Sequence, residues 1–192
     1  MFHQNEWPKP IARKGLLVWR LNRVLALVFS KAQELTDDDR YLPLVWSYMH
    51  MFSTMQIGKL VAIKRGLDPE LAALTCLFHD IYSLMTGKQT DHGPKAEVYI
   101  HSIIDEYNAE IRKELQPITD EEKQRIISAV KVHSDKTQAS SDPLIELLKD
   151  VDTLDSYLHG FSQDTESKRI ERGNNLLREL NIKHEIFDPF ID

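Results

Sequence analysis

Residues 68–80, DPELAALTCLFHD, are the clearest indication of how this chain folds. It begins with the pattern of a helix start: an N-cap aspartate (Asp68), a proline at the first helical position and an acid in the first turn. We expect this helix to run to about Met85, and it is apolar almost all round, which is typical of a helix at the centre of a fold. His79 and Asp80 therefore lie in an apolar interior, where an imidazole and a carboxylate each need a partner.

The chain on both sides of this stretch is also predicted to be helical. Apolar residues recur at spacings of three and four throughout, alternation of β-branched residues is almost absent, and glycine is scarce at seven residues. Two later helix starts are marked by a capping box at Thr119 and by an aspartate–proline pair at Asp142. The predicted fold class is therefore all-α. The expected helices cover residues 16–35, 42–65 (one long helix or a pair), 68–85, 94–115, 119–133, 143–160 and 162–180.

The length of the chain bounds its domain organisation. A chain of 192 residues fits a single domain, here expected over 1–192 with its core at about 45–160. The N-terminal helix (16–35) and the C-terminal helix (162–180) are expected to pack on that core. The C-terminal helix is less apolar than the others, so it could serve as a cover or as the surface of a homodimer.

Composition and charge exclude several classes of protein. The chain is 42% hydrophobic and 28% charged, which is ordinary for a soluble globular protein, and its net charge of −6 gives no sign of a nucleic-acid-binding surface. Charged and polar residues interrupt the run 15–30, so it does not predict a membrane span, and the segment 1–14 lacks the apolar run of a signal peptide. The single Cys76 cannot form an internal disulfide, which fits a cytoplasmic protein. We expect neither a nucleic-acid nor a membrane partner.

Two further histidines join the pair His79 and Asp80 on apolar helix faces. His50 lies four residues after a tryptophan in a strongly apolar helix, and His133 lies three and seven residues after apolar residues of its own helix. A lone inward histidine is more often a core residue than a metal ligand. Histidines and carboxylates that converge from separate helices, however, usually share a metal ion.

A second carboxylate comes from the helix that begins at Asp142. Asp152 lies four residues after Leu148, at the edge of the apolar stripe, and Asp155 follows three residues later, whereas Asp150 points elsewhere. A carboxylate that faces a core must be paired, hydrogen-bonded or metal-bound. On this helix alone, an acid at the rim of the stripe is an equally good explanation.

These residues occur in an order that resembles a known family. His50, the stretch 66–72 leading into 77–81, and the stretch 147–155 together resemble the HD superfamily of metal-dependent phosphohydrolases over roughly residues 45–160. The ordered set is specific, although each piece alone is weak. The resemblance implies an HD-domain helical bundle with a metal site in the core between the helices. The metal ligands that it implies are His50, His79, Asp80 and Asp152.

Two further matches point to a branch of that superfamily. The segment His92-Gly93-Pro94 with Ala96, and the segment 132–134 around His133, are similar to the branch that hydrolyses symmetric dinucleoside tetraphosphates. By that analogy His92 and His133 could bind a second ion. They could equally be groups of the second coordination shell or groups that contact substrate.

Other branches are disfavoured because their signatures are missing. The guanosine-tetraphosphate hydrolase branch has a Glu-Asp pair soon after its His-Asp motif, where this chain has Ser83 and Leu84. The deoxynucleotidase branch has a glutamate three residues after the aspartate of the motif, where this chain has Ser83. The cyclic-dinucleotide phosphodiesterase branch has a paired histidine and a Gly-Tyr-Pro signature, and neither occurs near His133.

The implied chemistry is phosphoester hydrolysis. Imidazole and carboxylate ligands suit one or two divalent ions of Mn, Fe, Co, Ni or Zn, with Mg also open. Such an ion can lower the pKa of a bound water to about 7 and polarise a phosphoryl oxygen. By the resemblance, Asp80 is a bridging ligand or base, and His92 and His133 could protonate the leaving oxygen or steady the phosphate. The implied substrate is a small phosphorylated molecule, a nucleotide or another phosphoester.

Nearby lysines are candidates for binding that phosphate. Lys95 lies three residues after His92, Lys136 lies three residues after His133, and Lys131 is a third candidate. Because Asp135 partly cancels the field of Lys136, Lys95 is the stronger candidate of the first two. Lysines of this kind are more commonly solvated surface charges.

Two other functions remain open from the sequence. A non-catalytic HD domain that binds metal or a nucleotide as a regulator would have the same ligands, and only turnover distinguishes it from a phosphohydrolase. A helical interaction protein would use the histidines as core residues and would bind no metal.

Overall fold

The computed structural model describes residues 19–111, 115–160 and 167–186, and within these residues it contains helices and no strands. The predicted all-α fold class is therefore confirmed. The helices are α1 (Trp19–Ala32), α2 (Leu44–Arg65), α3 (Pro69–Phe78), α4 (Ile81–Thr86), α5 (His92–Lys95), α6 (Glu97–Glu110), α7 (Asp120–Val132), α8 (Pro143–Leu158) and α9 (Ser167–Glu179).

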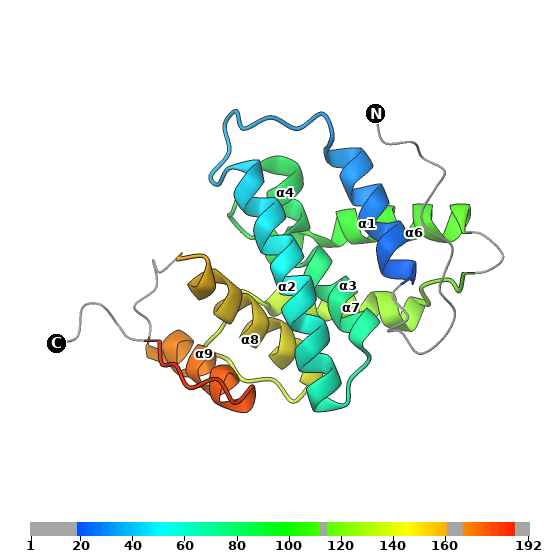
Figure 1. Cartoon of the computed structure of the whole chain (residues 1–192). Helices are drawn as coiled ribbons and strands as arrows, with labels where there is room; N and C mark the ends of the chain where they lie inside the picture. Colours follow the sequence, from blue (N-terminus) through cyan, green and yellow to red (C-terminus); the bar gives the residue numbers. More distant parts are fainter. Residues whose placement is uncertain (1–18, 112–114, 161–166, 187–192) are drawn as a thin grey trace.

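Helix α3 lies at the centre, as its apolar sequence predicts. Every residue of α3 after Pro69 is buried, and the helix packs against α1, α2, α7 and α8. Figure 1 shows it behind α2, with α1 and α6 on one side and α8 and α9 on the other. Asp68 accepts hydrogen bonds from the backbone N–H groups of Glu70 and Leu71, which confirms the predicted N-cap.

The prediction that this helix continues to about Met85 is wrong, because the chain breaks at His79 and Asp80 between α3 and α4. The Nδ1 of His79 donates to the carbonyl of Cys76 at 2.6 Å, and in a continuous helix that carbonyl would accept from the N–H of Asp80. Asp80 instead adopts φ −109° and ψ 20°. Because a regular helix would point these two adjacent side chains about 100° apart, the break allows both to face one space.

The segment predicted as one helix over 94–115 is also divided. The short α5 begins two residues earlier than predicted, and α6 then ends at Glu110 rather than Leu115. The chain turns back after α6, and the side chain of Asn108 exchanges two hydrogen bonds of 2.9 Å with the backbone of Ile118. These hydrogen bonds join Asn108 to a segment that follows the loop, so they are a tertiary feature. The periodicity of apolar residues does not predict them.

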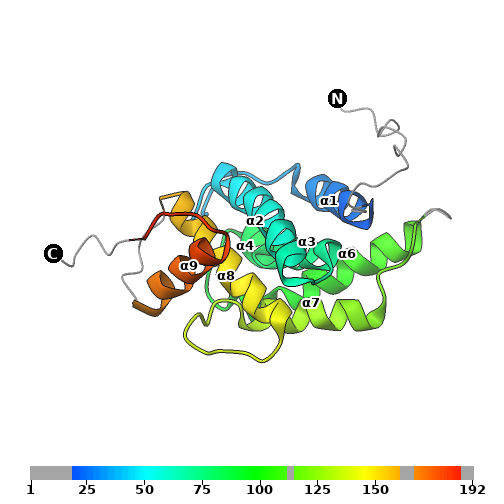
Figure 2. The same ribbon diagram turned by 60° about the horizontal axis from the view of Figure 1, so that its bottom comes forward.

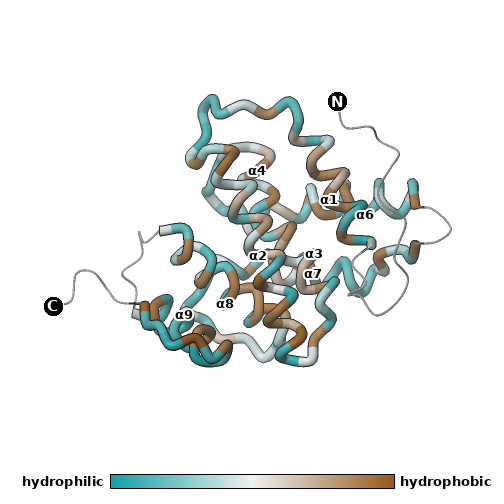
Figure 3. Tube along the Cα trace, viewed as in Figure 1, coloured by the Kyte–Doolittle hydropathy of each residue, from teal (hydrophilic) through white to brown (hydrophobic). Residues whose placement is uncertain are grey.

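The remaining helices follow the predicted pattern closely. Residues 44–65 form one helix rather than a pair, and α2 ends at Gly66, whose φ of 68° is one that glycine adopts without strain. Helix α1 packs on α3 and α6, and α9 packs on α8 (Figure 2). Brown, hydrophobic segments run along α1 and α2 in the middle of the molecule (Figure 3). The predicted helical residues 16–18 and 162–166 lie outside the described residues.

Among the described helices, none is both long enough and apolar enough to cross a membrane. The segment 1–14, which was predicted not to be a signal peptide, lies outside the described residues.

Candidate metal centre

Six side chains from separate parts of the chain meet at one place between the helices. They comprise four histidines and two aspartates, and each was predicted from the sequence as a site residue. They are His50 of α2, His79 and Asp80 at the break after α3, His92 of α5, His133 at the end of α7 and Asp152 of α8.

Four of these residues form the inner half of the cluster. The Nε2 atoms of His50 and His79 lie 2.9 Å apart, and the Nε2 of His50 lies 3.1 Å from Oδ1 of Asp152. The Oδ2 of Asp80 is 3.5 Å from the Nε2 of His79 and 3.8 Å from that of His50. Both histidines are almost completely buried.

The outer half is built on the other oxygen of the same aspartate. The Oδ1 of Asp80 lies 3.1 Å from the Nε2 of His92 and 3.6 Å from the Nε2 of His133. Those two histidine nitrogens are 3.0 Å apart. Asp80 therefore divides its two carboxylate oxygens between two pairs of histidines.

A glycine allows the outer pair to meet. A Cβ on Gly93 would lie 2.7 Å from the carbonyl oxygen of Val130 and 3.1 Å from that of Lys131, closer than a side chain tolerates. Glycine at this position lets α5 approach the end of α7, which brings His92 against His133.

The opposite nitrogen of each histidine is anchored. The Nδ1 of His79, His92 and His133 donates to the backbone carbonyl of Cys76, Gln89 and Val130, at 2.6, 2.8 and 2.7 Å. The Nδ1 of His50 donates instead to Oδ2 of Asp155 at 2.5 Å. Because a carbonyl can only accept, Nδ1 carries the hydrogen in His79, His92 and His133, and the Nε2 lone pair of a neutral ring points into the cluster.

Facing lone pairs need a positive charge between them. Burial opposes protonation of His50, but its hydrogen bonds with Asp152 and Asp155 outweigh burial and raise its pKa to about 10. Burial lowers the pKa of His79 to about 4, so the proton between the two Nε2 atoms belongs to His50, and His79 accepts from it. In the outer half, the hydrogen bond with Asp80 likewise overcomes burial and raises the pKa of His92. A divalent cation in place of these protons would satisfy the same lone pairs.

Both aspartates of the cluster are ionised. Burial alone would raise the pKa of Asp80, but the facing histidines hold it well below its usual range. The pKa of Asp152 is also held well below its usual range, against burial, by the ammonium of Lys136 and by His50. A set of four imidazoles and two ionised carboxylates, without a thiolate, fits a divalent ion of the Mn, Fe, Co, Ni or Zn type.

Helical phase correctly separates the two aspartates of α8. Asp152 faces the cluster, whereas Asp150 lies 2.7 Å from a guanidinium nitrogen of Arg65 and 2.6 Å from one of Arg172. Asp152 therefore points toward the histidines and Asp150 elsewhere, as helical phase predicts.

The structure reverses the expected order of the two lysines. The ammonium of Lys95 donates to the carbonyl of Thr90 at 3.0 Å and lies 3.4 Å from Asp91, on the surface. Lys136 is buried, and its ammonium pairs with Asp152 inside the cluster. The field argument from Asp135 failed because the Asp135 carboxylate caps the backbone N–H groups of Thr137 and Gln138 instead. The third candidate, Lys131, pairs with Glu97 at 2.7 Å.

Three residues around the cluster were given no role from the sequence. Asp155 contacts His50, His159 contacts Asp155 at 3.2 Å, and the Oγ of Ser134 lies 3.1 Å from the Nε2 of His92. Asp155 and His159 could have been found, since they continue the face of α8 that carries Asp152 at steps of three and four residues. Ser134 follows the helix, where spacing gives no signal.

The comparisons with known proteins agree with this geometry at the level of the family. The family model of the HD domain matches residues 47–159, which contain all six residues of the cluster. That match gives no support to the branch that hydrolyses dinucleoside tetraphosphates. Comparisons with curated proteins and with solved structures each gave no match. Since the family model covers more than half of the chain's length, the chain belongs to the HD domain family.

Proposed function

We propose that this protein is a metal-dependent phosphohydrolase that acts on a nucleotide or another small phosphoester. The observation that carries the proposal is the divided carboxylate of Asp80, which faces one histidine pair with each oxygen. This arrangement suits two neighbouring ions that share one bridging ligand. The inner ion would be held by His50, His79, Asp80 and Asp152, and the outer ion by Asp80, His92 and His133.

The residues of the cluster have distinct tasks in this proposal. A divalent ion supplies a Lewis acid that polarises a phosphoryl oxygen and activates water near neutral pH. His79 and His133 are almost fully buried with both nitrogens engaged, so they hold position and do not reach a leaving group. His92 is more exposed, with 17% of its side chain accessible, so it borders the space where substrate would enter.

Lys136 supplies the positive charge that a phosphate needs. Its ammonium is buried against Asp152, and burial lowers its pKa. If Asp152 held a divalent ion, Lys136 would remain beside that carboxylate, where its ammonium would add positive charge next to a bound phosphate. Lys95 is not part of the proposed site, because its contacts are with Thr90 and Asp91.

The test is a screen of nucleotides and other phosphoesters with Mn, Mg, Fe and Co. Wild-type protein is compared with His79→Ala and Asp80→Ala, and His101→Ala is the matched control, since this exposed histidine of α6 lies outside the cluster. We expect turnover that needs metal, is lost in the first two variants and is kept in the control. Activity that survived His79→Ala or Asp80→Ala would overturn the site.

A regulatory HD domain is the competing function. It would bind the same ions, and a nucleotide, without turnover. Metal binding with no hydrolysis of any phosphoester in the screen would therefore favour the regulator.

We place the protein in the cytoplasm on the basis of its one cysteine, Cys76, which is free and buried.

A further inference from the structure

One histidine of the cluster is held differently from the other three. His79, His92 and His133 donate from Nδ1 to backbone carbonyls, whereas His50 donates to the carboxylate of Asp155. Asp155 lies on α8 three residues after Asp152 and is completely buried. A carboxylate behind a metal-ligating imidazole fixes its tautomer and makes its other nitrogen a stronger ligand.

Packing does not explain this buried carboxylate. Its Oδ2 accepts from His50 at 2.5 Å and lies 3.2 Å from the Nδ1 of His159, which donates to the backbone carbonyl of Asp155 at 3.1 Å. Its Oδ1 has no hydrogen-bond partner among the described residues. Leaving a buried carboxylate oxygen unsatisfied is costly, so the contribution of Asp155 lies in what Oδ2 does for the two histidines.

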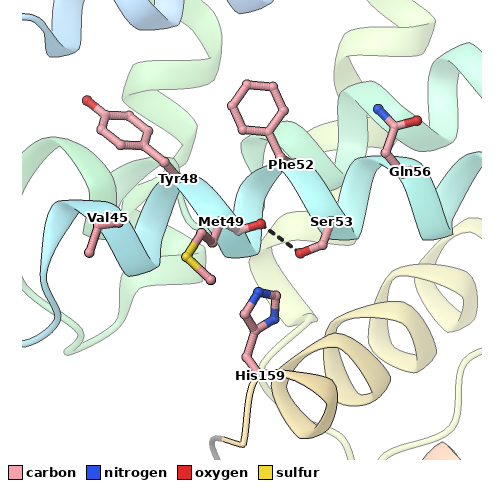
Figure 4. Close-up of a pocket in the computed structure, with 7 residues that line it drawn as sticks. All are labelled: Val45, Tyr48, Met49, Phe52, Ser53, Gln56 and His159. Carbon is pink, nitrogen blue, oxygen red and sulfur yellow. Dashed lines mark hydrogen bonds between the residues drawn. The ribbon is translucent and has the colours of Figure 1, made fainter.

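His159 is the outer end of this chain of contacts. It caps the C-terminus of α8, and its ring lies opposite Met49 and Ser53 of α2 (Figure 4). There it lines a surface groove of about 660 Å³ on the outer side of α2. The contacts thus run from the surface, through Asp155, to the Nδ1 of His50.

We infer that Asp155 and His159 are positioning residues that hold His50 as a ligand of the inner ion. Asp155 fixes the ring and its tautomer, and His159 fixes the carboxylate. The inference rests on the proposed metal site. Neither residue touches the ion or the substrate.

The test measures Co²⁺ binding to the full chain by competitive titration and by the Co²⁺ absorption spectrum. Asp155→Asn keeps the shape of the side chain and removes its charge. We expect it to weaken Co²⁺ binding by roughly 10–100-fold, the range for residues behind metal-ligating histidines, and to change the spectrum. Asp150→Asn is the matched control, because it makes the same change on the same helix, and it should alter neither. His159→Phe, near the surface, should weaken binding less than Asp155→Asn.

The outcomes separate the two proposals. If wild-type protein binds no Co²⁺, the proposed metal site fails. If wild-type protein binds Co²⁺ but both Asp155→Asn and His159→Phe bind as tightly with an unchanged spectrum, the positioning role alone is wrong. Because His159 is near the surface, its variant tests the chain of contacts even if Asp155→Asn does not fold.

A second inference rests on a different observation, the outward face of α2. Val45, Met49, Phe52, Leu60 and Ile63 are all exposed, with Val45 and Leu60 each at 63%. Together with Gln56 they are spaced at intervals of four, three, four, four and three residues, a spacing that keeps residues on one side of a helix. A seam of this spacing is typical of a helix that pairs with another helix.

Charges at the two ends of this face indicate the partner. Asp37, Asp38 and Asp39 are exposed just before α2, and Asp37 accepts from the N–H of Leu44 at 2.6 Å, whereas Lys64 is exposed at the other end. In an antiparallel pair the acids of each copy would meet the lysine of the other. Helix α9 is a weaker candidate surface, because its Leu176 and Leu177 are already buried against the chain. We infer that α2 forms an antiparallel, two-fold contact with α2 of a second copy.

Sedimentation of the full chain over a range of concentrations tests this contact. We expect a dimer for wild-type protein, a monomer for Leu60→Lys, and a dimer for Val98→Lys, a control at another exposed apolar residue, on α6. Lys64→Glu should weaken the dimer, and adding Asp38→Lys should restore it. A wild-type monomer at every concentration, whether the face is covered by another part of the chain or by a different protein, would overturn the inference. A dimer that is unchanged by Leu60→Lys would do the same.

Discussion

Two carboxylates of α8, only two residues apart, belong to opposite kinds of polar cluster. Asp150 joins an arginine network, in which Arg65 also pairs with Glu179 at 2.7 Å and Arg172 also pairs with Glu146 at 2.9 Å. Asp152 joins the histidine cluster, in which it also pairs with the ammonium of Lys136. The two sites use similar acids with different bases.

The difference lies in whether each cluster is complete. Arginine is a permanent cation with several donors, so every carboxylate of the network around Asp150 has a guanidinium partner. Imidazole nitrogens face one another across 2.9 and 3.0 Å in the other cluster, and they need a proton or a metal ion between them. The first cluster therefore stabilises the fold, whereas the second could hold a cation.

Exchanging each acid for its amide tests whether Asp150 and Asp152 serve these different clusters. We expect Asp152→Asn to weaken metal binding and kcat/KM by more than the roughly 10–100-fold that outer-shell changes cause, because it removes a ligand. Asp150→Asn should leave both unchanged and lower the free energy of unfolding by about 1–3 kcal/mol, because it weakens the pairing of two arginines. Metal titration and urea unfolding of both variants measure the difference. Equal loss of metal binding in both would contradict the separation.

Adding metal should stabilise only one of the two clusters. At about 100 times Kd, Mn²⁺ or Co²⁺ should raise the free energy of unfolding by about 2.7 kcal/mol per site, which raises Tm by roughly 5–10 °C in a chain of this size. Thermal unfolding with and without metal, and again after a chelator, measures this. The rise should vanish in Asp152→Asn and persist in Asp150→Asn.

Removing an arginine should have the reverse pattern. Arg65→Met leaves Asp150 and Glu179 without one of their partners, so we expect a loss of about 1–3 kcal/mol in stability and no change in metal affinity. Arg178→Met is the control, because this arginine is largely exposed and should stay within about 0.5 kcal/mol of wild type. A change of metal affinity in Arg65→Met would show that the two clusters are coupled through α8.

Acid should weaken the arginine network by a smaller amount. The hydrogen bond from Arg65 lowers the pKa of Glu179 below its ordinary value of 4.5. A carboxylate with a lowered pKa in the folded state contributes stability above its unfolded pKa and loses it as the pH falls through the folded pKa. Unfolding between pH 7 and pH 3 should show this loss in wild-type protein. The same series should be flatter below about pH 4.5 in Glu179→Gln.

Much of the fold was predictable because capping residues and the spacing of apolar residues are local sequence patterns. The capping residues Asp68, Thr119 and Asp142 mark three helix starts, and each makes the expected side-chain bond to the backbone. The break at His79 was not predictable, because the imidazole competes for a backbone carbonyl that the helical pattern assigns to an N–H. The end of α6 at Glu110 depends on contacts with the returning chain, which periodicity does not contain.

The site was predictable to a similar extent. Helical phase and the order of the motifs gave all six residues that the structure brings together. The relation between the two halves was not predictable, because it depends on the orientation of one carboxylate, that of Asp80, after the helix break. The ranking of Lys136 was missed because proximity in sequence to Asp135 says little about which carboxylate its ammonium meets in space.

The helices that carry the two halves of the cluster differ in how firmly they are held. His50 and His79 come from α2 and from the end of the buried α3, whereas His92 comes from the four-residue α5. A short helix with an accessible ligand opens locally more often than a long buried one. An ion in the outer half should therefore exchange with solvent faster than one in the inner half. Dilution of a fully loaded protein should then release its metal in two phases, the outer ion leaving first.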